Sequence, residues 1–192
     1  MDFKEELAKW REERSITLES QLPGLTSNLL EEVTELSRAT ELVDIIDAML
    51  DYNVFLANAI EGIEIDPVLD PEIVKEIEEK HKKLSVMTNE DLALYKKSLI
   101  SLLLEGIRAS IAITMPNIKQ EHIDSFTEYL NGIIINIKSS ITLLNYDYAK
   151  CLEEVMKAIH TRKGHWDSTI CKFVKDKVQP DRYEPDYTNC KL

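Results

Sequence analysis

The stretch NLLEEVTELSRATELVDIIDAMLDYNVFLAN, which covers residues 28–58, decides the fold of this chain. It holds seven carboxylates, and Arg38 is the only basic residue between Arg14 and Lys75. Carboxylates at this density repel one another unless they face water or gather around a cation. The function of the chain depends on which of these arrangements the fold produces. The seven carboxylates are Glu31, Glu32, Glu35, Glu41, Asp44, Asp47 and Asp51.

Helical periodicity separates these acids from the apolar side chains, because each residue of an α-helix advances by about 100°. In residues 29–36 the apolar side chains share one face and the glutamates cover the opposite face. In residues 41–60 apolar side chains surround a narrow polar stripe, which is typical of a buried helix. Buried carboxylates are paired or bind metal, and this second helix contains no Lys or Arg. The stripe consists of Asp44, Asp47, Asp51 and Asn58.

A break between two helices near residues 37–40 would bring both acidic stripes to one site. Thr40 is a suitable N-cap for the second helix, and Glu41 is favourable in its first turn. Ligands that offer only oxygen suit Mg²⁺ or Mn²⁺. The sequence therefore predicts an all-α helical bundle with a carboxylate-lined metal site. The alternative is an acidic face in water, which describes the charged residues 72–83 better than residues 41–60.

Two short motifs in this stretch resemble those of a known family. Glu31-Glu32-Val33-Thr34-Glu35 has the form EExxE, and Glu41-Leu42-Val43-Asp44 has the form ExxD. Both are similar to motifs of the all-α nucleoside triphosphate pyrophosphohydrolases, the MazG-like superfamily. The run from Ile46 to Asp51, with Val54-Phe55 and Asn58-Ala59 after it, looks like the second metal helix of phage-encoded members. We prefer this register, which uses Asp47 and Asp51, and keep Glu41 and Asp44 as alternates.

The resemblance implies Mg²⁺-dependent hydrolysis of (deoxy)nucleoside triphosphates to nucleoside monophosphate and pyrophosphate, with Mn²⁺ as a possible substitute. It implies metal ligands at Glu31, Glu32, Glu35, Asp47 and Asp51, with Glu32 or Glu35 free to activate water instead. An enzyme specific for dUTP or phosphoribosyl-ATP is one alternative. A non-catalytic helical interaction protein with degenerate motifs is another. The chain has no GxxxxGK[ST] loop of a P-loop NTPase and no HExxH or paired cysteine ligands for zinc.

Length and composition describe a single domain over residues 1–192. A net charge of −12 argues against unspecific binding to nucleic acid or anionic membranes. No apolar run reaches about 18 residues, and the charged N-terminus does not resemble a signal peptide. The three cysteines lack CxxC spacing and are typical of free thiols in a reducing cytosol, which is the host cytoplasm if the chain is phage-encoded.

Outside the acidic stretch the pattern predicts more helices. One covers residues 2–14, and a turn follows at residues 21–24, with N-caps for the first acidic helix at residues 26–28. A charged connecting segment, residues 65–90, contains the helix at 72–83. Long apolar helices at 92–115 and 119–143 suggest a homodimer or higher homo-oligomer. Asp147 caps a last helix that runs from Tyr148 to about His160.

The C-terminal tail, residues 161–192, is basic and resembles the tail of the same phage enzymes. Its cations are suited to phosphates that the metal holds, although a solvated tail is the alternative. We predict substrate contacts from Arg162, Lys163 and Lys172, together with Asn58 on the acidic helix. Tyr183 is a candidate for stacking on the base, as is Tyr187.

Overall fold

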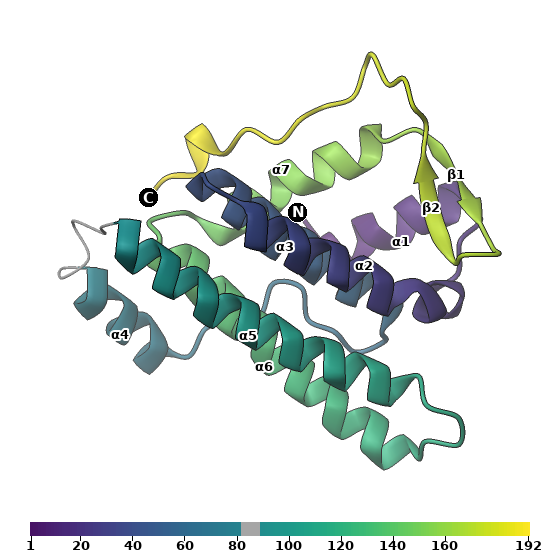
Figure 1. The fold of residues 1–192 in the computed structure, drawn as a ribbon, viewed down its shortest axis with the longest axis horizontal. Coiled ribbons are helices and arrows are strands. Elements are labelled where there is room, and N and C mark those ends of the chain that lie inside the picture. The colour runs from purple at the N-terminus through teal and green to yellow at the C-terminus, as the bar shows by residue number, and fades with distance from the viewer. Residues whose placement is uncertain (82–88) are drawn as a thin grey trace.

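The computed structural model describes residues 1–81 and 89–192 (Figure 1). The described part is mainly helical, which confirms the predicted bundle. The sequence around Thr88 predicts an N-cap for the long helix at 92–115, and Thr88 lies outside the described residues. The elements are α1 (Phe3–Glu13), α2 (Leu18–Arg38), α3 (Leu42–Ala59), α4 (Pro71–His81), α5 (Asn89–Ile113), α6 (Gln120–Leu143), α7 (Tyr148–Thr161), β1 (Gly164–Asp167), β2 (Lys172–Lys175) and the 3₁₀ turn η1 (Tyr187–Cys190).

The acidic stretch forms the antiparallel hairpin of α2 and α3, and the predicted break is confirmed. Helix α2 ends at Arg38, and α3 begins after Glu41 rather than after Thr40. Glu41 takes the N-cap position but makes no side-chain capping bond there. The two helices pack against each other more extensively than any other pair in the described chain. Their side-by-side alignment brings the acidic stripes to one face of the hairpin.

The predicted turn at residues 21–24 and the N-caps at 26–28 are wrong. Helix α2 begins at Leu18 under a cap from Thr17, whose hydroxyl accepts a hydrogen bond from the Ser20 amide at 3.2 Å. Pro23 lies early in the helix, so its missing N–H removes only one helical hydrogen bond. Gly24 serves packing instead of a turn. A Cβ atom there would lie 2.0 Å from the carbonyl oxygen of Cys171, in the tail.

The core lies between the α2–α3 hairpin and the helices around it. Helix α5 packs against α2, α6 packs against α5, and α7 packs against both α1 and α3. The α5–α6 pair extends away from the rest of the bundle in the lower half of Figure 1. This pairing explains part of the apolar surface of both helices. Fully buried core side chains include Leu29, Leu36, Ile46, Leu50, Leu103, Ile134 and Ile137.

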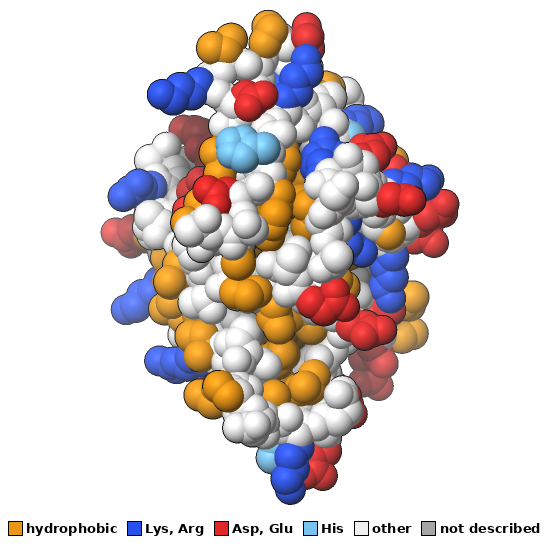
Figure 2. Space-filling view, turned by 90° about the vertical axis from the view of Figure 1, so that its right-hand side faces the viewer, with side chains coloured by type: hydrophobic (Ala, Val, Ile, Leu, Met, Phe, Trp, Pro, Cys, Tyr) orange, Lys and Arg blue, Asp and Glu red, His pale blue; other side chains and the backbone are white. Residues whose placement is uncertain are grey.

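Some large apolar side chains remain exposed on the α5–α6 pair, among them Leu94, Ile111 and Tyr129. Figure 2 shows one face of the molecule, on which apolar side chains form a band along the middle and charged side chains line the edges. Within the part of the chain that the structure describes, no helix is both long and apolar enough to cross a membrane.

The tail departs from the all-α prediction, because it holds an antiparallel β-hairpin. Its register runs from Gly164 opposite Lys175 to Asp167 opposite Lys172. Asp167 closes the connection by accepting a hydrogen bond from the Thr169 amide at 2.8 Å, and Cys171 adopts a positive φ of 49°. After β2 the tail runs back along the bundle to η1, close to α7 (Figure 1). The tail is thus a folded part of the domain.

Candidate functional site

A cavity of about 500 Å³ lies between the α2–α3 hairpin and the C-terminal tail. Helix α2 contributes one stripe of side chains at helical spacing, and α3 contributes a second stripe. The end of α7 and the β-hairpin form the opposite wall. Because α2 and α3 run antiparallel, Glu35 lies near the Asp47 end of α3, whereas Gln21 lies near Asn58. The amide of Gln21 donates to the carbonyl oxygen of Asn58 at 2.6 Å.

Five carboxylates line the α2–α3 side of this cavity, and we name them the acidic floor: Glu31, Glu32, Glu35, Asp47 and Asp51. Glu32 and Asp51 are buried, with exposed fractions of 5% and 8%. Among the described residues, Oε2 of Glu32 has no hydrogen-bond partner. A buried carboxylate without a partner carries a large desolvation cost, which proton uptake or a bound cation can remove.

The electrostatics of the acidic floor reflect this crowding. Burial raises the pKa of Glu32 to about 9, and the charges of Asp51, Glu35 and Asp47 add to the effect. Burial and then the Asp51 charge raise the pKa of Asp47 to about 6, while a hydrogen bond from Tyr187 acts in the opposite direction. These shifts favour a proton on the acidic floor near neutral pH, foremost on Glu32. A divalent cation that binds there would have to displace it.

Four cations line the wall that faces the acidic floor, and we name them the basic wall: Arg162, Lys172, Lys175 and Arg182. Nη2 of Arg162 lies 3.3 Å from Oδ2 of Asp51, and both side chains are largely buried. The ammonium group of Lys172 contacts the Glu31 carboxylate. Desolvation and the charge of Arg162 lower the pKa of Lys175. The basic wall thus neutralises part of the acidic floor and leaves cationic groups at the cavity.

The cavity has an aromatic end next to its charged end. Trp10 of α1 and Phe173 of β2 meet edge to face, with ring centroids 5.5 Å apart. Trp166 of β1 also lines the cavity. Asn28, one helical turn from Glu32, is 7% exposed, and within the described chain its Oδ1 has no hydrogen-bond partner. Flat apolar surface beside an unpartnered amide is suited to a heterocyclic base.

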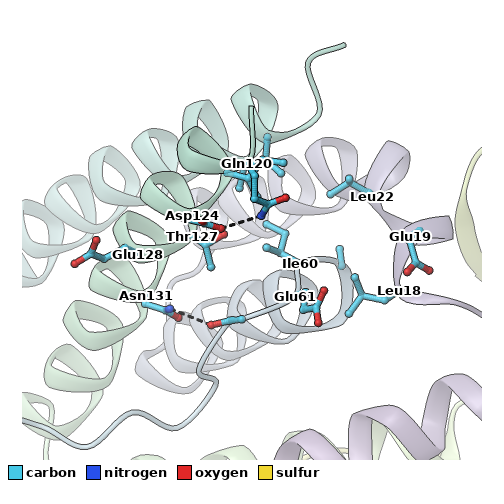
Figure 3. Close-up of a pocket in the computed structure, with 14 residues that line it drawn as sticks. Leu18, Glu19, Leu22, Ile60, Glu61, Gln120, Asp124, Thr127, Glu128 and Asn131 are labelled. Atoms are coloured by element: carbon cyan, nitrogen blue, oxygen red, sulfur yellow. Dashed lines mark hydrogen bonds between the residues drawn. The ribbon is translucent and has the colours of Figure 1, made fainter. Parts of the chain in front are cut away.

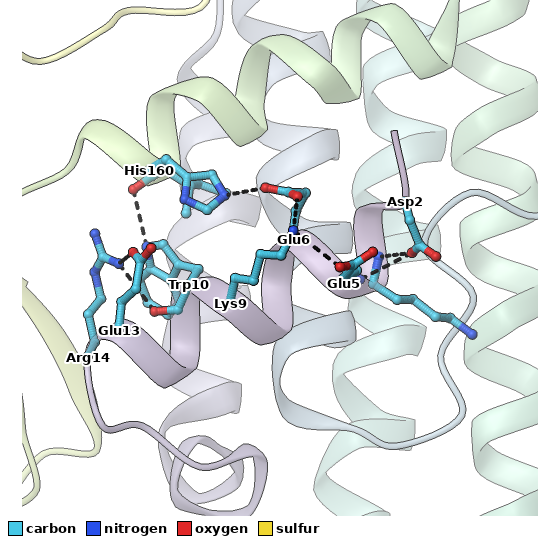
Figure 4. A network of polar contacts seen from close by, with 10 residues as sticks. Asp2, Glu5, Glu6, Lys9, Trp10, Glu13, Arg14 and His160 are labelled. Atoms are coloured by element: carbon cyan, nitrogen blue, oxygen red, sulfur yellow. Dashed lines mark hydrogen bonds and ion pairs between the residues drawn. The ribbon is translucent and has the colours of Figure 1, made fainter.

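A polar network holds α1 and Trp10 in place (Figure 4). Nε1 of Trp10 donates to the carbonyl oxygen of Ile159 at 3.2 Å, and Nε2 of His160 lies 3.3 Å from the Glu6 carboxylate. Arg14 stacks over the Trp10 ring at 4.8 Å from its centroid. These contacts join α1 to the end of α7, where the tail begins.

The structure brings together most of the side chains that the sequence singled out. The whole acidic floor, Asn58, Arg162 and Lys172 line the cavity. The alternates Glu41 and Asp44 are exposed and lie outside it, so the Asp47 and Asp51 register is the one that faces the cavity. Asn58 is already engaged, because its Oδ1 accepts a hydrogen bond from Arg11 at 2.7 Å.

Two predicted substrate contacts lie elsewhere. Lys163 is exposed and pairs with Asp181 at 3.3 Å, away from the cavity. Tyr183 donates to the carboxylate of Glu154 on α7 and does not line the cavity. A place in the basic tail therefore does not by itself bring a side chain to the cavity.

Sequence reasoning missed several side chains that line the cavity. Asn28 had a detectable signal, since it precedes Glu31 and Glu32 by three and four residues and so shares their helix face. Lys175 and Arg182 belong to the basic tail but carry no pattern of their own. Trp166 and Phe173 come to the cavity only through the pairing of β1 with β2.

A second cavity, of about 650 Å³, lies between the start of α2, the end of α3 and the α5–α6 pair (Figure 3). Leu18, Leu22 and Ile60 give it an apolar lining, and Glu19 and Glu61 lie on its rim. No Lys or Arg is among the described residues that line it. This cavity therefore lacks the opposed charges of the first one.

The donor set of the acidic floor fits a hard divalent cation, because it consists of carboxylate oxygens and includes the unpartnered Oε2 of Glu32. Across the described ranges, however, no group of three or more His, Cys, Asp or Glu side chains is arranged so that it could hold a metal ion. Asp51, Glu31 and Asp47 instead contact Arg162, Lys172 and Tyr187. Metal binding at this site requires the two ion pairs, of Asp51 with Arg162 and of Glu31 with Lys172, to open, whereas the hydrogen bond from Tyr187 occupies only one oxygen of Asp47.

Comparison of the chain with protein-family models, with curated proteins and with solved structures finds no match.

Proposed function

We propose that the chain is a Mg²⁺-dependent nucleoside triphosphate pyrophosphohydrolase, which releases nucleoside monophosphate and pyrophosphate. The observation that carries the proposal is the cavity in which the acidic floor faces the basic wall beside an aromatic end. A triphosphate bound with its metal needs both charge types at once. A base needs the flat apolar surface that Trp10, Trp166 and Phe173 offer. The EExxE motif adds the reaction class by resemblance.

The roles divide by burial and charge. Glu31, Glu32, Asp47 and Asp51 would hold Mg²⁺, which when bound offsets the negative charge that develops on the phosphates. Arg162, Lys172, Lys175 and Arg182 bind the phosphate oxygens. Glu35 is exposed at the edge of the acidic floor, where water has access, and accepts the proton of the attacking water. Attack at the α-phosphorus breaks its bond to the bridging oxygen, and pyrophosphate leaves with that oxygen.

Substrate and metal binding would exchange the ion pairs between the acidic floor and the basic wall for new ones. In the apo protein Arg162 neutralises Asp51, and Lys172 neutralises Glu31. Mg²⁺ held by the acidic floor would supply that neutralisation, and Arg162 and Lys172 would then be free to bind phosphate oxygens. Each buried charge would keep a partner of opposite sign, which avoids the cost of an unpaired buried charge.

The test is pyrophosphate release measured over a panel of ribo- and deoxynucleoside triphosphates, with Mg²⁺ and with EDTA. We expect metal-dependent release of pyrophosphate and monophosphate in equal amounts. Turnover confined to dUTP, or seen only with phosphoribosyl-ATP, would favour the specific enzymes instead. No turnover of any nucleotide, with no metal binding, would overturn the proposal in favour of a helical interaction protein.

We also propose that the protein forms at least a homodimer in the cytoplasm. Large apolar side chains on α5 remain in contact with solvent, including Leu104 at 38% and Ile111 at 39% exposure. A second copy packed on this helix would bury them. Light scattering at micromolar concentration tests this, and a monomer would contradict it.

A further inference from the structure

The last residues of the tail are fixed to the bundle near the start of α7. The Asp147 amide donates to the carbonyl oxygen of Cys190 at 2.7 Å, and the Leu192 amide donates to the carbonyl oxygen of Asn145 at 3.0 Å. Asp186 caps η1 by accepting a hydrogen bond from the Thr188 amide at 3.0 Å. Tyr187 is therefore held on a short, well-anchored turn, and its ring is buried.

From this anchor the Tyr187 hydroxyl reaches α3 and donates a hydrogen bond to Oδ1 of Asp47. The two residues are 140 positions apart in sequence, so no local pattern reveals the contact. The bond occupies one oxygen of the Asp47 carboxylate. Within the described chain no hydrogen bond to the second oxygen, Oδ2, is found, which leaves it available to a cation. Tyr187 itself does not line the cavity, whereas Asp47 does.

We propose that Tyr187 is a positioning residue, which orients Asp47 as a metal ligand from outside the cavity. The inference rests on the proposed function, since it assigns Asp47 a metal. A free aspartate rotates about two side-chain torsions, and a ligand that rotates must lose this freedom on binding. A hydrogen bond from a rigid donor restricts the carboxylate before the metal binds, so that less conformational entropy is lost on binding. Partners of this kind typically contribute 10- to 100-fold to metal affinity or activity.

The tail offers a matched control. The Tyr183 hydroxyl also donates a hydrogen bond to a carboxylate, that of Glu154 on α7, but neither residue lines the cavity. Tyr183→Phe and Tyr187→Phe therefore remove the same atom from the same segment of chain. Only the second variant loosens a side chain that lines the cavity.

The experiment measures Mn²⁺ binding to the full chain by calorimetry without nucleotide, together with the Mg²⁺ concentration for half-maximal pyrophosphate release. For Tyr187→Phe we expect the half-maximal Mg²⁺ concentration and the Mn²⁺ dissociation constant to rise about 10-fold or more. Tyr183→Phe should leave both unchanged. In the Asp47→Asn background, Tyr187→Phe should cause no further loss, because the ligand that it positions is already gone.

The outcomes separate this inference from the proposed function. If the wild type is active and Tyr187→Phe keeps the same metal dependence, the positioning role is wrong and the proposed function stands. If Tyr187→Phe fails to fold, Tyr187 holds the tail rather than the ligand, and the inference is overturned. A wild type that binds no Mn²⁺ and turns over no nucleotide overturns both.

Discussion

Asp51 is the residue at which the metal hypothesis is tested most directly. It is 8% exposed and lies 3.3 Å from Arg162. Asp51→Asn keeps the shape of the side chain and removes the charge that a hard cation needs. Relief of repulsion on the acidic floor and loss of the ion pair with Arg162 act in opposite directions, so the apo melting temperature should change little. Turnover should fall by about 100-fold or more, because the metal stabilises charge in the transition state.

The control for Asp51→Asn is Glu79→Gln, on the exposed face of α4. It removes one carboxylate from the same chain and should leave turnover unchanged. A folded Asp51→Asn protein with full activity would show that the metal, if any, binds elsewhere.

Glu32 should make the stability of the apo protein depend on pH. Its pKa is raised from 4.5 to about 9 by burial and neighbouring acids. Between these values the folded protein holds a proton that the unfolded chain has released, so stability falls as pH rises through this window. The slope is at most about 1.4 kcal/mol per pH unit. In EDTA, the melting temperature should therefore be higher at pH 6 than at pH 8.5.

Glu32→Gln removes the titrating group and is the comparison for this slope. The variant should melt at a higher temperature than the wild type at pH 8.5 and show a flatter profile. An equally steep profile in the variant would place the proton on another group.

At the scale of elements, sequence reasoning worked where periodicity is long and strong. The break at residues 37–40 was predictable without Gly or Pro, because the acidic stripes change direction there, and α3 follows its apolar pattern closely. Local turn rules gave a wrong prediction where tertiary packing determines the conformation. Pro23-Gly24 resembles a turn, yet both residues lie inside α2. Gly24 is explained by packing, since the backbone of Cys171 approaches it too closely for a Cβ atom.

The tail shows why half of the candidate site could not be predicted. The acidic floor comes from two neighbouring helices and follows from helical spacing alone. The basic wall depends on a β-hairpin whose connection, residues 168–171, contains no Asn-Gly or Asp-Gly turn. Which cations face the acids is then set by strand pairing. Lys172 reaches Glu31 across 141 positions, whereas Lys163 points away.

Gly24→Ala tests whether the tail must approach α2 closely. A Cβ atom at this position would lie 2.0 Å from the carbonyl oxygen of Cys171, so β2 has to move away from α2. Lys172 would then leave Glu31, and we expect a raised KM for the nucleotide and a lower melting temperature. The loss should exceed the gain of about 1 kcal/mol that Ala brings to a helix interior.

Gly132→Ala on α6 is the matched control, because a Cβ atom there meets nothing within 4 Å. It should raise stability by up to about 1 kcal/mol and leave KM unchanged. If Gly24→Ala is equally stabilising and fully active, the tail does not need its present contact with α2.

At the scale of the whole molecule, charge and metal are linked. The chain carries a net charge of −12, so any salt relieves part of its self-repulsion. Specific binding of Mg²⁺ to the acidic floor has to be separated from this general effect. The comparison is therefore between MgCl₂ and NaCl at equal ionic strength, with the melting temperature as the measurement.

A metal that binds only the folded protein stabilises it by mass action, by about 2.7 kcal/mol at a hundredfold excess over its dissociation constant. For a chain of this length that corresponds to a rise of roughly 5–10 °C in the melting temperature. Glu32→Gln should lose most of this rise while keeping the response to NaCl, because it removes the buried ligand and leaves the surface charge almost unchanged. Equal melting curves in the two salts for the wild type would mean that the acidic floor is neutralised by the basic wall alone. The cavity would then be a structural ion-pair cluster rather than a metal centre, and the proposed chemistry would have no place in this fold.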